Sequence, residues 1–469
     1  MDFESFRAEV KRVVSGDKVI ESRGELMLYS YDASPAESAI PRMVIQPETT
    51  NEVSEVIKLA NKYLIPIVPS SGRTSLHGGP IPYNGAVVLD LMRMNKVLEV
   101  NLEDSYVHVE VGVRLDELNA ELARHGHFFP PDPASSAAAT VGGSLANGAG
   151  GMRGAKYGTV KDWVLGAEVV LPTGEPVFMG CRTLKCRAGY DLLSLVIGSE
   201  GTLGVITNAY LKIWPLPEAI VRLRVYFRDI VDAARAVGMI KARGFRPLIV
   251  EFLDRGTMEA VSGYVKEFTY PRDSEAMLII DLDGPPEAMK RYIDSMVNIL
   301  KGAGGYEIEW TGDKDEMDRI YMARRAAYPA LLRLFSGMRV MPEDISVPPS
   351  RLPEAVKGIG SIASKYGLKI VTWGHVGDGN LHPNIIYNPN DQSSVSRLYS
   401  VSRELGLMAI NLGGTVSSEH GIGVLKKDLL TSELEVKGIA QLRLMKAIKR
   451  VFDPNNICLL YTSPSPRDS

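Results

Sequence analysis

The sequence predicts an α+β fold with two differently built halves, and three observations lead to this prediction. Up to about residue 214, short apolar strands alternate with helices and glycine-rich loops. The segment WPLPEA, which contains Pro215 and Pro217, then has the composition of a linker. Beyond it, strands are separated by long amphipathic helices, a pattern typical of a split βαβ, ferredoxin-like sheet.

The first half carries clear helix and strand signals. A helix is expected over TTNEVSEVIKLANKYL, capped by Thr50 or Asn51, and another over LDELNAELARHG, closed by Gly126. IPIVPS, AVVLDL, YVHVEVGV and VITNAYLKIW are expected strands, and WVLGAEVVLPTGEPVFM is an expected hairpin. Residues 130–158 are dense in glycine and alanine and show almost no helical pattern.

The second half contains three strand and helix repeats. VRLRVYF, IVDAARAVGMIKARG and PLIVEFLD form the first, and MLIIDLD, PPEAMKRYIDSMVNILKGAGG and YEIEW form the second. SRLPEAVKGIGSIASKYG and LKIVTWGHV form the third, and ELEVKGIAQLRLMKAIKRVF reads as a final helix. We expect an antiparallel or mixed sheet with helices on one face.

Composition excludes several classes of protein. The net charge is −3 and the basic residues are spread along the chain, so no footprint for nucleic acid exists. No apolar run reaches the roughly 18 residues of a membrane span, and the N-terminus resembles neither a secretory signal nor a transit peptide. Cys181 and Cys186 are read as two free thiols, and three cysteines alone hold no iron–sulfur cluster. A reducing, cytoplasmic setting is expected.

Two loops have the composition of a phosphate cradle. They are PSSGRTSLHGGPIP, residues 69–82, and PPDPASSAAATVGGSLANGAGGMRGAKYG, residues 130–158. Small residues let backbone N–H groups approach a diphosphate, and hydroxyls and Arg73 add donors. G-x-G-x-x-G and the Walker A loop are both absent, which excludes these signatures in their usual form. Ordinary turns are the alternative for either loop taken alone.

Histidines and a carboxylate gather in two further segments. WGHVGDGNLHPN carries His375 and His382, and GGTVSSEHGIG carries Glu419 and His420. Two imidazoles and a carboxylate suit a divalent metal ion with positions open for substrate. The alternative is loop histidines that hydrogen-bond to backbone groups.

Taken together, the motifs resemble the vanillyl-alcohol-oxidase type of FAD-binding fold. The first loop resembles P-x-G-G-G-T-G-x-x-G-G, the second P-D-P…T-x-G-G…A-G-G…K-Y-G, and GSEGTLGVIT matches that fold's third landmark. G-H-x-G-D-G-N-x-H and G-x-x-x-x-E-H-G-I-G are matched letter for letter. Over residues 20–457 the chain resembles the family of FAD-linked D-lactate dehydrogenases and glycolate oxidase flavoprotein subunits. The fold class implied is a two-subdomain FAD-binding domain of this type plus a ferredoxin-like α+β substrate (cap) domain with C-terminal helices.

The resemblance implies a bound FAD. The implied cofactor residues are Pro69, Ser70, Ser71, Gly72, Arg73, Thr74, Ser75, Pro133, Thr140, Gly142, Gly143, Ser144, Ala146, Gly150, Gly151, Tyr157, Glu200, Gly204, Val205 and Ile206. Relatives with covalently attached flavin place a histidine roughly where Thr74 stands. Because this chain has a threonine at that position, we expect the FAD to be bound non-covalently. Arg73 departs from the family pattern and requires a negative φ or a strained backbone.

The resemblance also implies the catalytic groups. His375, His382 and Glu419 would bind the divalent metal, zinc or manganese, and His420 would be the catalytic base. Asn384 would contact substrate. Within IYMARRAAYPALL, read as one helix, Arg324 would clamp the substrate carboxylate and Tyr328, one turn further, would line the pocket. Without the family, either Arg324 or Arg325 reads equally well as part of a solvated helix face.

The implied reaction is metal-assisted oxidation of D-lactate or glycolate to the 2-oxo acid, with hydride transferred to flavin N5. Electrons would pass to an external quinone, cytochrome or iron–sulfur partner protein. The alternatives are a D-2-hydroxyglutarate dehydrogenase, disfavoured because Pro342 stands where such relatives carry lysine, a non-redox alkyl-glycerone-phosphate synthase-like flavoenzyme, and a flavin-free metal-binding protein. Peripheral membrane attachment through the acceptor and a homo-oligomeric state are left open.

The expected domain boundaries follow from these assignments. Residues 1–217 form the FAD-binding domain, with an N-terminal helix over about 1–16, and residues 218–430 form the substrate domain with the metal site. Residues 431–457 form a C-terminal helical segment. CLLYTSPSPRDS, residues 458–469, is rich in serine and proline and is expected to be a non-native tail, with a genuine disordered tail as the alternative.

Overall fold

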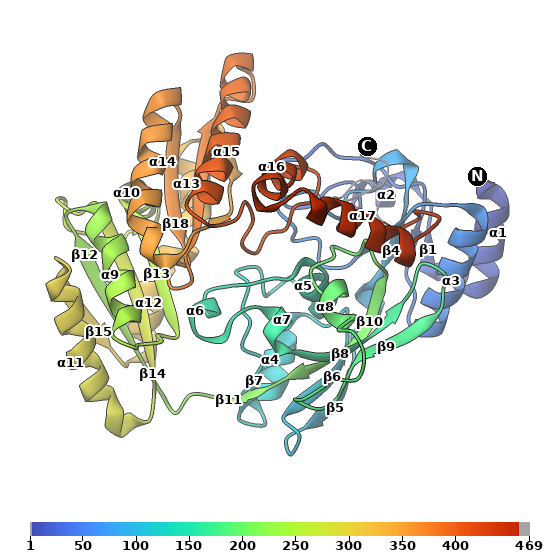
Figure 1. The fold of residues 1–469 in the computed structure, drawn as a ribbon, viewed down its shortest axis with the longest axis horizontal. Helices are drawn as coiled ribbons and strands as arrows, with labels where there is room; N and C mark the ends of the chain where they lie inside the picture. Colours follow the sequence, from blue (N-terminus) through green and yellow to red (C-terminus); the bar gives the residue numbers. More distant parts are fainter. Residues whose placement is uncertain (1, 459–469) are drawn as a thin grey trace. The chain divides into compact units, whose positions relative to one another are not determined.

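The computed structural model describes residues 2–458 (Figure 1). Within them the chain divides into two compact units. The first contains residues up to 151, residues 159–216 and the chain from 419 onward, and the second contains 152–158 and 217–418. The domain boundaries expected from the sequence stay a prediction, and these units differ from them at 152–158 and after 418.

The first unit begins with a small sheet of order β1-β2-β4-β3. Its strands are β1 (Val19–Ile20), β2 (Val44–Ile45), β4 (Val87–Asp90) and β3 (Ile67–Ser70), of which the last three are parallel. Helix α3 (Thr50–Tyr63) joins β2 to β3 and packs against α1 (Phe3–Val13). The cap of α3 is Thr49, whose hydroxyl accepts the N–H of Glu52, so the expected cap is displaced by one residue.

A second, antiparallel sheet of order β5-β6-β10-β8-β9 completes this unit. Its strands are β5 (Val97–Asn101), β6 (Tyr106–Glu110), β10 (Val205–Lys212), β8 (Val164–Val170) and β9 (Pro176–Gly180). Helix α4 (Leu115–Ala123) follows β6, as expected. The shared core of α3, β3, β4, β6, β8 and β10 is built from aliphatic side chains that are almost completely buried.

The glycine-rich stretch contains helices, contrary to the sequence prediction. Helix α5 (Val141–Asn147) begins at Thr140, whose hydroxyl accepts the N–H of Gly143, and ends at Gly148 with φ 71°. A second helix, α6 (Gly154–Tyr157), follows. The capping pattern is present in the sequence, but the glycines of α5 leave no apolar periodicity to reveal it.

The second unit contains an eight-stranded sheet in which every pairing is antiparallel. Its order is β15-β12-β14-β13-β18-β19-β16, with β17 also pairing with β19. The strands are β15 (Tyr306–Thr311), β12 (Ala219–Phe227), β14 (Ala276–Gly284), β13 (Ile249–Asp254), β18 (Lys369–Gly374), β19 (Asn380–Tyr387), β16 (Arg339–Pro342) and β17 (Ile345–Ser346).

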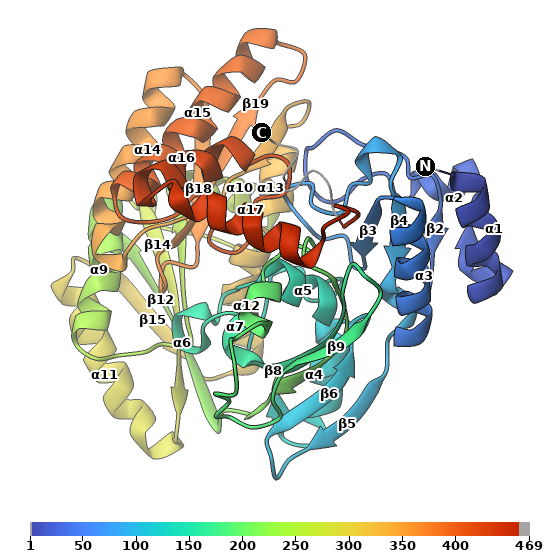
Figure 2. The same ribbon diagram turned by 45° about the vertical axis from the view of Figure 1, so that its right-hand side comes forward.

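Helices cover both faces of this sheet, not one face as expected (Figure 2). One face packs on α9 (Ile230–Ala242), α11 (Pro286–Gly302) and α14 (Leu352–Tyr366). The other packs on α10 (Arg255–Tyr264), α12 (Lys314–Arg325) and α13 (Ala327–Leu334) through a core that includes Met277, Ile279 and Leu253. Strands such as PLIVEF and MLIID are apolar on both sides, a pattern typical of burial on both faces, so the sequence carried a signal that the expectation of one covered face did not use.

Two helices expected to be continuous are broken. The chain leaves helical register at Ala326, between α12 and α13, because Pro329 has no N–H for the carbonyl of Arg325. The C-terminal helix divides into α16 (Lys427–Lys437) and α17 (Ala440–Phe452) at Gly438, which has φ 118°.

The cysteines also differ from the prediction of free thiols. Cys181 and Cys186 form a disulfide, with Cα atoms 6.0 Å apart, within the usual span of such a bond. Cys458, the first residue of the expected non-native tail, is a buried free cysteine, and its backbone forms an isolated parallel β-bridge with Ile67, the first residue of β3. Residues 459–469 of that tail lie outside the described residues. Among residues 2–458, helices long and apolar enough to cross a membrane are absent.

Candidate active site

A cavity of about 360 Å³ lies in the first unit, between both glycine-rich loops and the start of β10. The predicted cofactor residues that line it are Pro69, Ser70, Ser71, Gly72, Arg73, Thr74, Ser75, Pro133, Thr140, Gly142, Gly143, Ser144, Ala146, Gly150, Glu200, Gly204, Val205 and Ile206. Gly151 and Tyr157 are not in its lining, and Tyr157 belongs to the second unit. Asn147 and Ser199 line the cavity and were missed, although each adjoins a predicted residue. Glu419 and His420 line it as well.

Close backbone approach requires the glycines of this cavity. A Cβ on Gly72 would lie 2.4 Å from the carbonyl oxygen of Ala138, and one on Gly142 would lie 2.6 Å from Cβ of Val111. Real Cβ atoms do not approach so closely, so the two loops can meet at Gly72, and the second loop can pack on Val111 at Gly142, only because these residues lack side chains.

Three serine hydroxyl groups of the cavity lining are buried. The side-chain oxygens of Ser70, Ser144 and Ser199 are buried and have no hydrogen-bond partner within residues 2–458. Ser71 and Thr140 bond to each other at 2.7 Å. Buried hydroxyls are nearly always hydrogen-bonded, so these three fit the phosphate or ribose oxygens of a dinucleotide.

The backbone of Arg73 is strained, which is one of the two alternatives expected from the sequence. Its φ is 49°, in the left-handed region that favours glycine. The guanidinium lies 4.3 Å from the ring centroid of Tyr29 and donates to the carbonyl of Leu28. The side chain thus ties the first loop to residues 28–29.

Glu200 fastens the loop that carries His420. Its carboxylate accepts the backbone N–H of Ile422 at 2.6 Å and that of Gly423 at 2.9 Å. Burial raises the pKa of Glu200, and the two N–H groups only partly oppose this effect. The side chain of Asn147 donates to the carbonyl of Glu419 at 2.7 Å. The loop is therefore held by two residues of the cavity lining, Asn147 and Glu200.

In the second unit, His375 and His382 lie side by side at the junction of β18 and β19. Trp373 pairs with His382 across these strands, and His375 follows at the turn. The two imidazole centroids are 5.1 Å apart with nearly perpendicular rings, and each residue is 4% exposed. The turn that connects the antiparallel strands β18 and β19 thus brings these two histidines together.

Glu251, on β13, joins two of the predicted residues. One carboxylate oxygen lies 2.6 Å from Nδ1 of His375, and the other accepts Nε of Arg324 at 2.6 Å. Burial by itself raises the pKa of Glu251, but the contacts with His375 and Arg324 outweigh it and the pKa is lowered. The sequence analysis missed Glu251. Its only signal is a lone acid within the otherwise apolar PLIVEF.

Arg324 is a buried cation with unused donors. Its side chain is 10% exposed, and its two Nη groups donate to no acceptor within residues 2–458. The neighbouring Arg325 is exposed. A guanidinium held by Nε keeps its two Nη groups available. This pair of planar donors, called the fork of Arg324 below, suits the two oxygens of a carboxylate.

The other two predicted substrate residues differ in burial. Tyr328 lies in the first turn of a separate helix, α13, and is 40% exposed, so the expected spacing of one helical turn from Arg324 is interrupted. Asn384 is completely buried on β19. Its amide nitrogen donates to the carbonyl of His382 at 2.7 Å, and its oxygen has no partner among the described residues.

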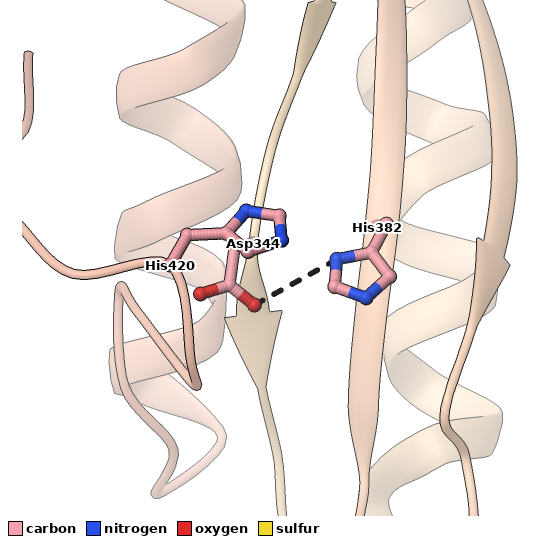
Figure 3. A group of neighbouring side chains, drawn as sticks. All are labelled: Asp344, His382 and His420. Atoms are coloured by element: carbon pink, nitrogen blue, oxygen red, sulfur yellow. Dashed lines mark ion pairs between the residues drawn. The ribbon is translucent and has the colours of Figure 1, made fainter. Parts of the chain in front are cut away.

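Asp344 is a second acid that the sequence analysis missed. Its Oδ1 lies 3.7 Å from Nδ1 of His382, an ion pair marked by the dashed line in Figure 3. The same oxygen accepts a hydrogen bond from the side-chain amide of Asn380 at 2.9 Å. Its Oδ2 accepts the N–H of Ser418 at 2.8 Å and the hydroxyl of Ser417 at 3.0 Å. Asp344 therefore binds the segment that immediately precedes Glu419.

Two models of known protein families match this chain, one in its first half and one in its second half. The model described as "FAD binding domain" matches residues 41–180, and the model described as "FAD linked oxidases, C-terminal domain" matches residues 216–459. The resemblance identified from the loop and histidine motifs is confirmed.

Relatives align over nearly the whole length. Glycolate oxidase subunit GlcD of Bacillus subtilis is 38% identical over 437 residues, covering 93% of this chain and 92% of that protein. D-lactate dehydrogenase of Anaerostipes hadrus is 33% identical, covering 95% and 93%. D-lactate dehydrogenase of Archaeoglobus fulgidus is 34% identical, covering 94% and 96%.

Solved structures share the fold. A p-cresol methylhydroxylase with substrate bound has a TM-score of 0.82 at 20% identity, covering all of this chain and 98% of that one. 4-Ethylphenol oxidase from Gulosibacter chungangensis has a TM-score of 0.81 at 19% identity, with the same coverage. The predicted fold class, an α+β chain with a vanillyl-alcohol-oxidase type FAD-binding fold, is confirmed.

Proposed function

The chain belongs to the family of FAD-linked oxidases and is an FAD-dependent oxidoreductase acting on CH–OH groups; from this premise we propose that it oxidises a small 2-hydroxy acid, D-lactate or glycolate. When bound, FAD supplies the acceptor for the hydride that leaves the α-carbon. Electrons then pass to an external quinone, cytochrome or iron–sulfur partner protein. The acceptor and a cytoplasmic setting stay predictions.

The proposed substrate class rests mainly on Arg324, whose two Nη groups have no acceptor among the described residues. A buried guanidinium without a second acceptor is costly, and a substrate carboxylate satisfies it with two parallel hydrogen bonds. Asn384, with its buried and unpartnered amide oxygen, supplies an acceptor for a hydroxyl group. An acid beside a hydroxyl is what a 2-hydroxy acid presents.

His420 is the proposed base. It lines the cavity of the first unit beside Ser70, Ser144 and Ser199, the residues that fit a dinucleotide. An imidazole there removes the hydroxyl proton while the hydride leaves. The loop contacts of Glu200 keep its backbone in place.

We further propose that His375, His382 and Glu419 supply the ligands of a divalent ion, zinc or manganese. The donor chemistry fits, because two adjacent buried imidazoles and a carboxylate are the usual ligands of such ions. When bound, the ion would polarise the substrate hydroxyl. The participation of Glu419, which belongs to the first unit, is part of the proposal.

A substrate screen tests this function. Short 2-hydroxy acids of both hands, including 2-hydroxyglutarate, would be offered to the purified protein with an artificial dye as electron acceptor. We expect dye reduction with D-lactate or glycolate and little with L-lactate. A preference for 2-hydroxyglutarate would move the assignment to a dicarboxylic substrate. Flavin that is never reduced by any 2-hydroxy acid would contradict the proposal.

A further inference from the structure

We propose that Glu251 is a positioning residue that serves both halves of the reaction site. Its carboxylate holds the ring proton of His375 on Nδ1, so that Nε2 carries the lone pair a metal ion requires, and it holds Arg324 by Nε. This inference rests on the proposed function, because it assigns His375 to a metal and Arg324 to a substrate.

The hydrogen-bond chemistry determines the tautomer. An ionised carboxylate has only acceptor oxygens, so the contact of 2.6 Å to Nδ1 of His375 needs a proton on that nitrogen. In the neutral ring, Nε2 is then the acceptor. A carboxylate behind a metal-binding histidine also fixes the ring orientation and raises its basicity.

The second oxygen of Glu251 determines which nitrogen of the Arg324 guanidinium is bound by the protein. It accepts Nε at 2.6 Å, on the side of the guanidinium away from the fork, and leaves both Nη groups available. One rigid, fully buried side chain thus sets the direction of the histidine lone pair and of the arginine fork.

A neighbouring ion pair shows what a purely structural arrangement looks like in this sheet. Asp281, on β14, uses both oxygens on Arg222, at 2.7 Å to Nε and 2.6 Å to Nη2, and Nη1 donates to the carbonyl of Met317. Each nitrogen of that guanidinium has a protein acceptor. Glu251 differs because it divides its oxygens between an arginine and a histidine, and leaves the fork of Arg324 open.

The variant Glu251→Gln tests the tautomer directly. The amide oxygen of glutamine must face the Nε donor of Arg324, so its NH₂ group faces Nδ1 of His375. Nδ1 then becomes an acceptor and the ring proton moves to Nε2. We expect affinity for Mn²⁺ or Zn²⁺ to fall about 10- to 100-fold, the usual effect of losing such a partner.

The measurements use the FAD-loaded protein after chelation. Equilibrium dialysis with Mn²⁺ or Zn²⁺ gives affinity and stoichiometry, and flavin absorbance shows that the cofactor is retained. ¹⁵N spectra of histidine-labelled, metal-free protein, with the His375 signal assigned by its loss in His375→Gln, give the tautomer. Asp281→Asn is the matched control, and we expect it to lower thermal stability while metal affinity stays at the wild-type value.

The outcomes are distinguishable. A His375 proton on Nε2 in the wild-type protein overturns the inference even if no variant folds. Equal metal affinity in wild type and Glu251→Gln, with an unchanged tautomer, overturns it as well. Wild-type protein that takes up no metal contradicts the proposed metal site instead, and the tautomer then decides the role of Glu251.

Discussion

The carboxylate of Glu200 accepts the backbone N–H of Ile422 at 2.6 Å across 222 residues of chain. This contact joins the segment GSEGTLGVIT to the loop EHGIG, two motifs that are distant in sequence and that both contribute residues to the lining of the cavity in the first unit.

Glu200→Gln should therefore loosen the loop of His420. One amide oxygen cannot replace two acceptors, and the N–H of Ile422 or Gly423 would lose its partner. We expect a loss of ~1–3 kcal/mol in the free energy of unfolding and a lower kcat. Chemical denaturation and steady-state kinetics measure both, and an unchanged stability would show that water replaces the lost acceptor.

FAD should be removable from the native protein and dependent on Gly72. Acid precipitation is expected to leave flavin in the supernatant; yellow colour in the pellet would contradict non-covalent binding. Gly72→Ala should abolish flavin retention, because the new Cβ would meet the carbonyl of Ala138 at 2.4 Å. Gly24→Ala is the control, since a Cβ there meets nothing within 4 Å.

His420→Ala should act on the chemical step. Loss of a general base typically lowers kcat about 10²- to 10⁴-fold. Flavin absorbance should persist, because the dinucleotide-fitting serines lie elsewhere in the lining. Near-normal kcat with D-lactate or glycolate would mean that another group takes the proton.

Arg324→Ala should act mainly on substrate binding. Removing charge-assisted hydrogen bonds worth ~1.5–3 kcal/mol raises KM about 10- to 100-fold. Arg324→Lys should recover little, since a point charge does not replace a planar fork. The exposed neighbour Arg325 gives the matched control, and Arg325→Ala should leave KM unchanged. If both alanine variants give equal KM values, the clamp lies elsewhere.

Asp254 should make stability depend on pH. Burial raises the pKa of Asp254 from its usual 3.8 to about 6, although hydrogen bonds from Thr257 and Thr372 oppose the shift. Between these values the folded state keeps a proton that the unfolded state has lost, so stability falls as pH rises through this window, by up to ~3 kcal/mol. Denaturation at pH 4 and pH 7 should show this fall in wild type but not in Asp254→Asn. Equal pH dependence in both proteins would contradict the assignment.

Local sequence was sufficient to predict those features whose geometry depends only on residues within the same segment. The two glycine loops, the strings around His375 and Glu419, and most strands were predicted because composition, capping residues and period 2 or 3.6 act over a few neighbours. The family resemblance, not local sequence, indicated Arg324 as the proposed substrate arginine, and Arg324 is less exposed than Arg325.

Only the tertiary structure decided which distant groups meet. Glu251 and Asp344 look unremarkable in sequence, and each becomes part of the site because strand pairing brings it to a histidine. The helices that cover both faces of the eight-stranded sheet likewise depend on packing between segments that are distant in sequence. Periodicity shows which face of its own helix or strand a residue occupies. The hydrogen bond that His375 donates to Glu251 depends instead on the register of β13 against β18, which no short window of sequence contains.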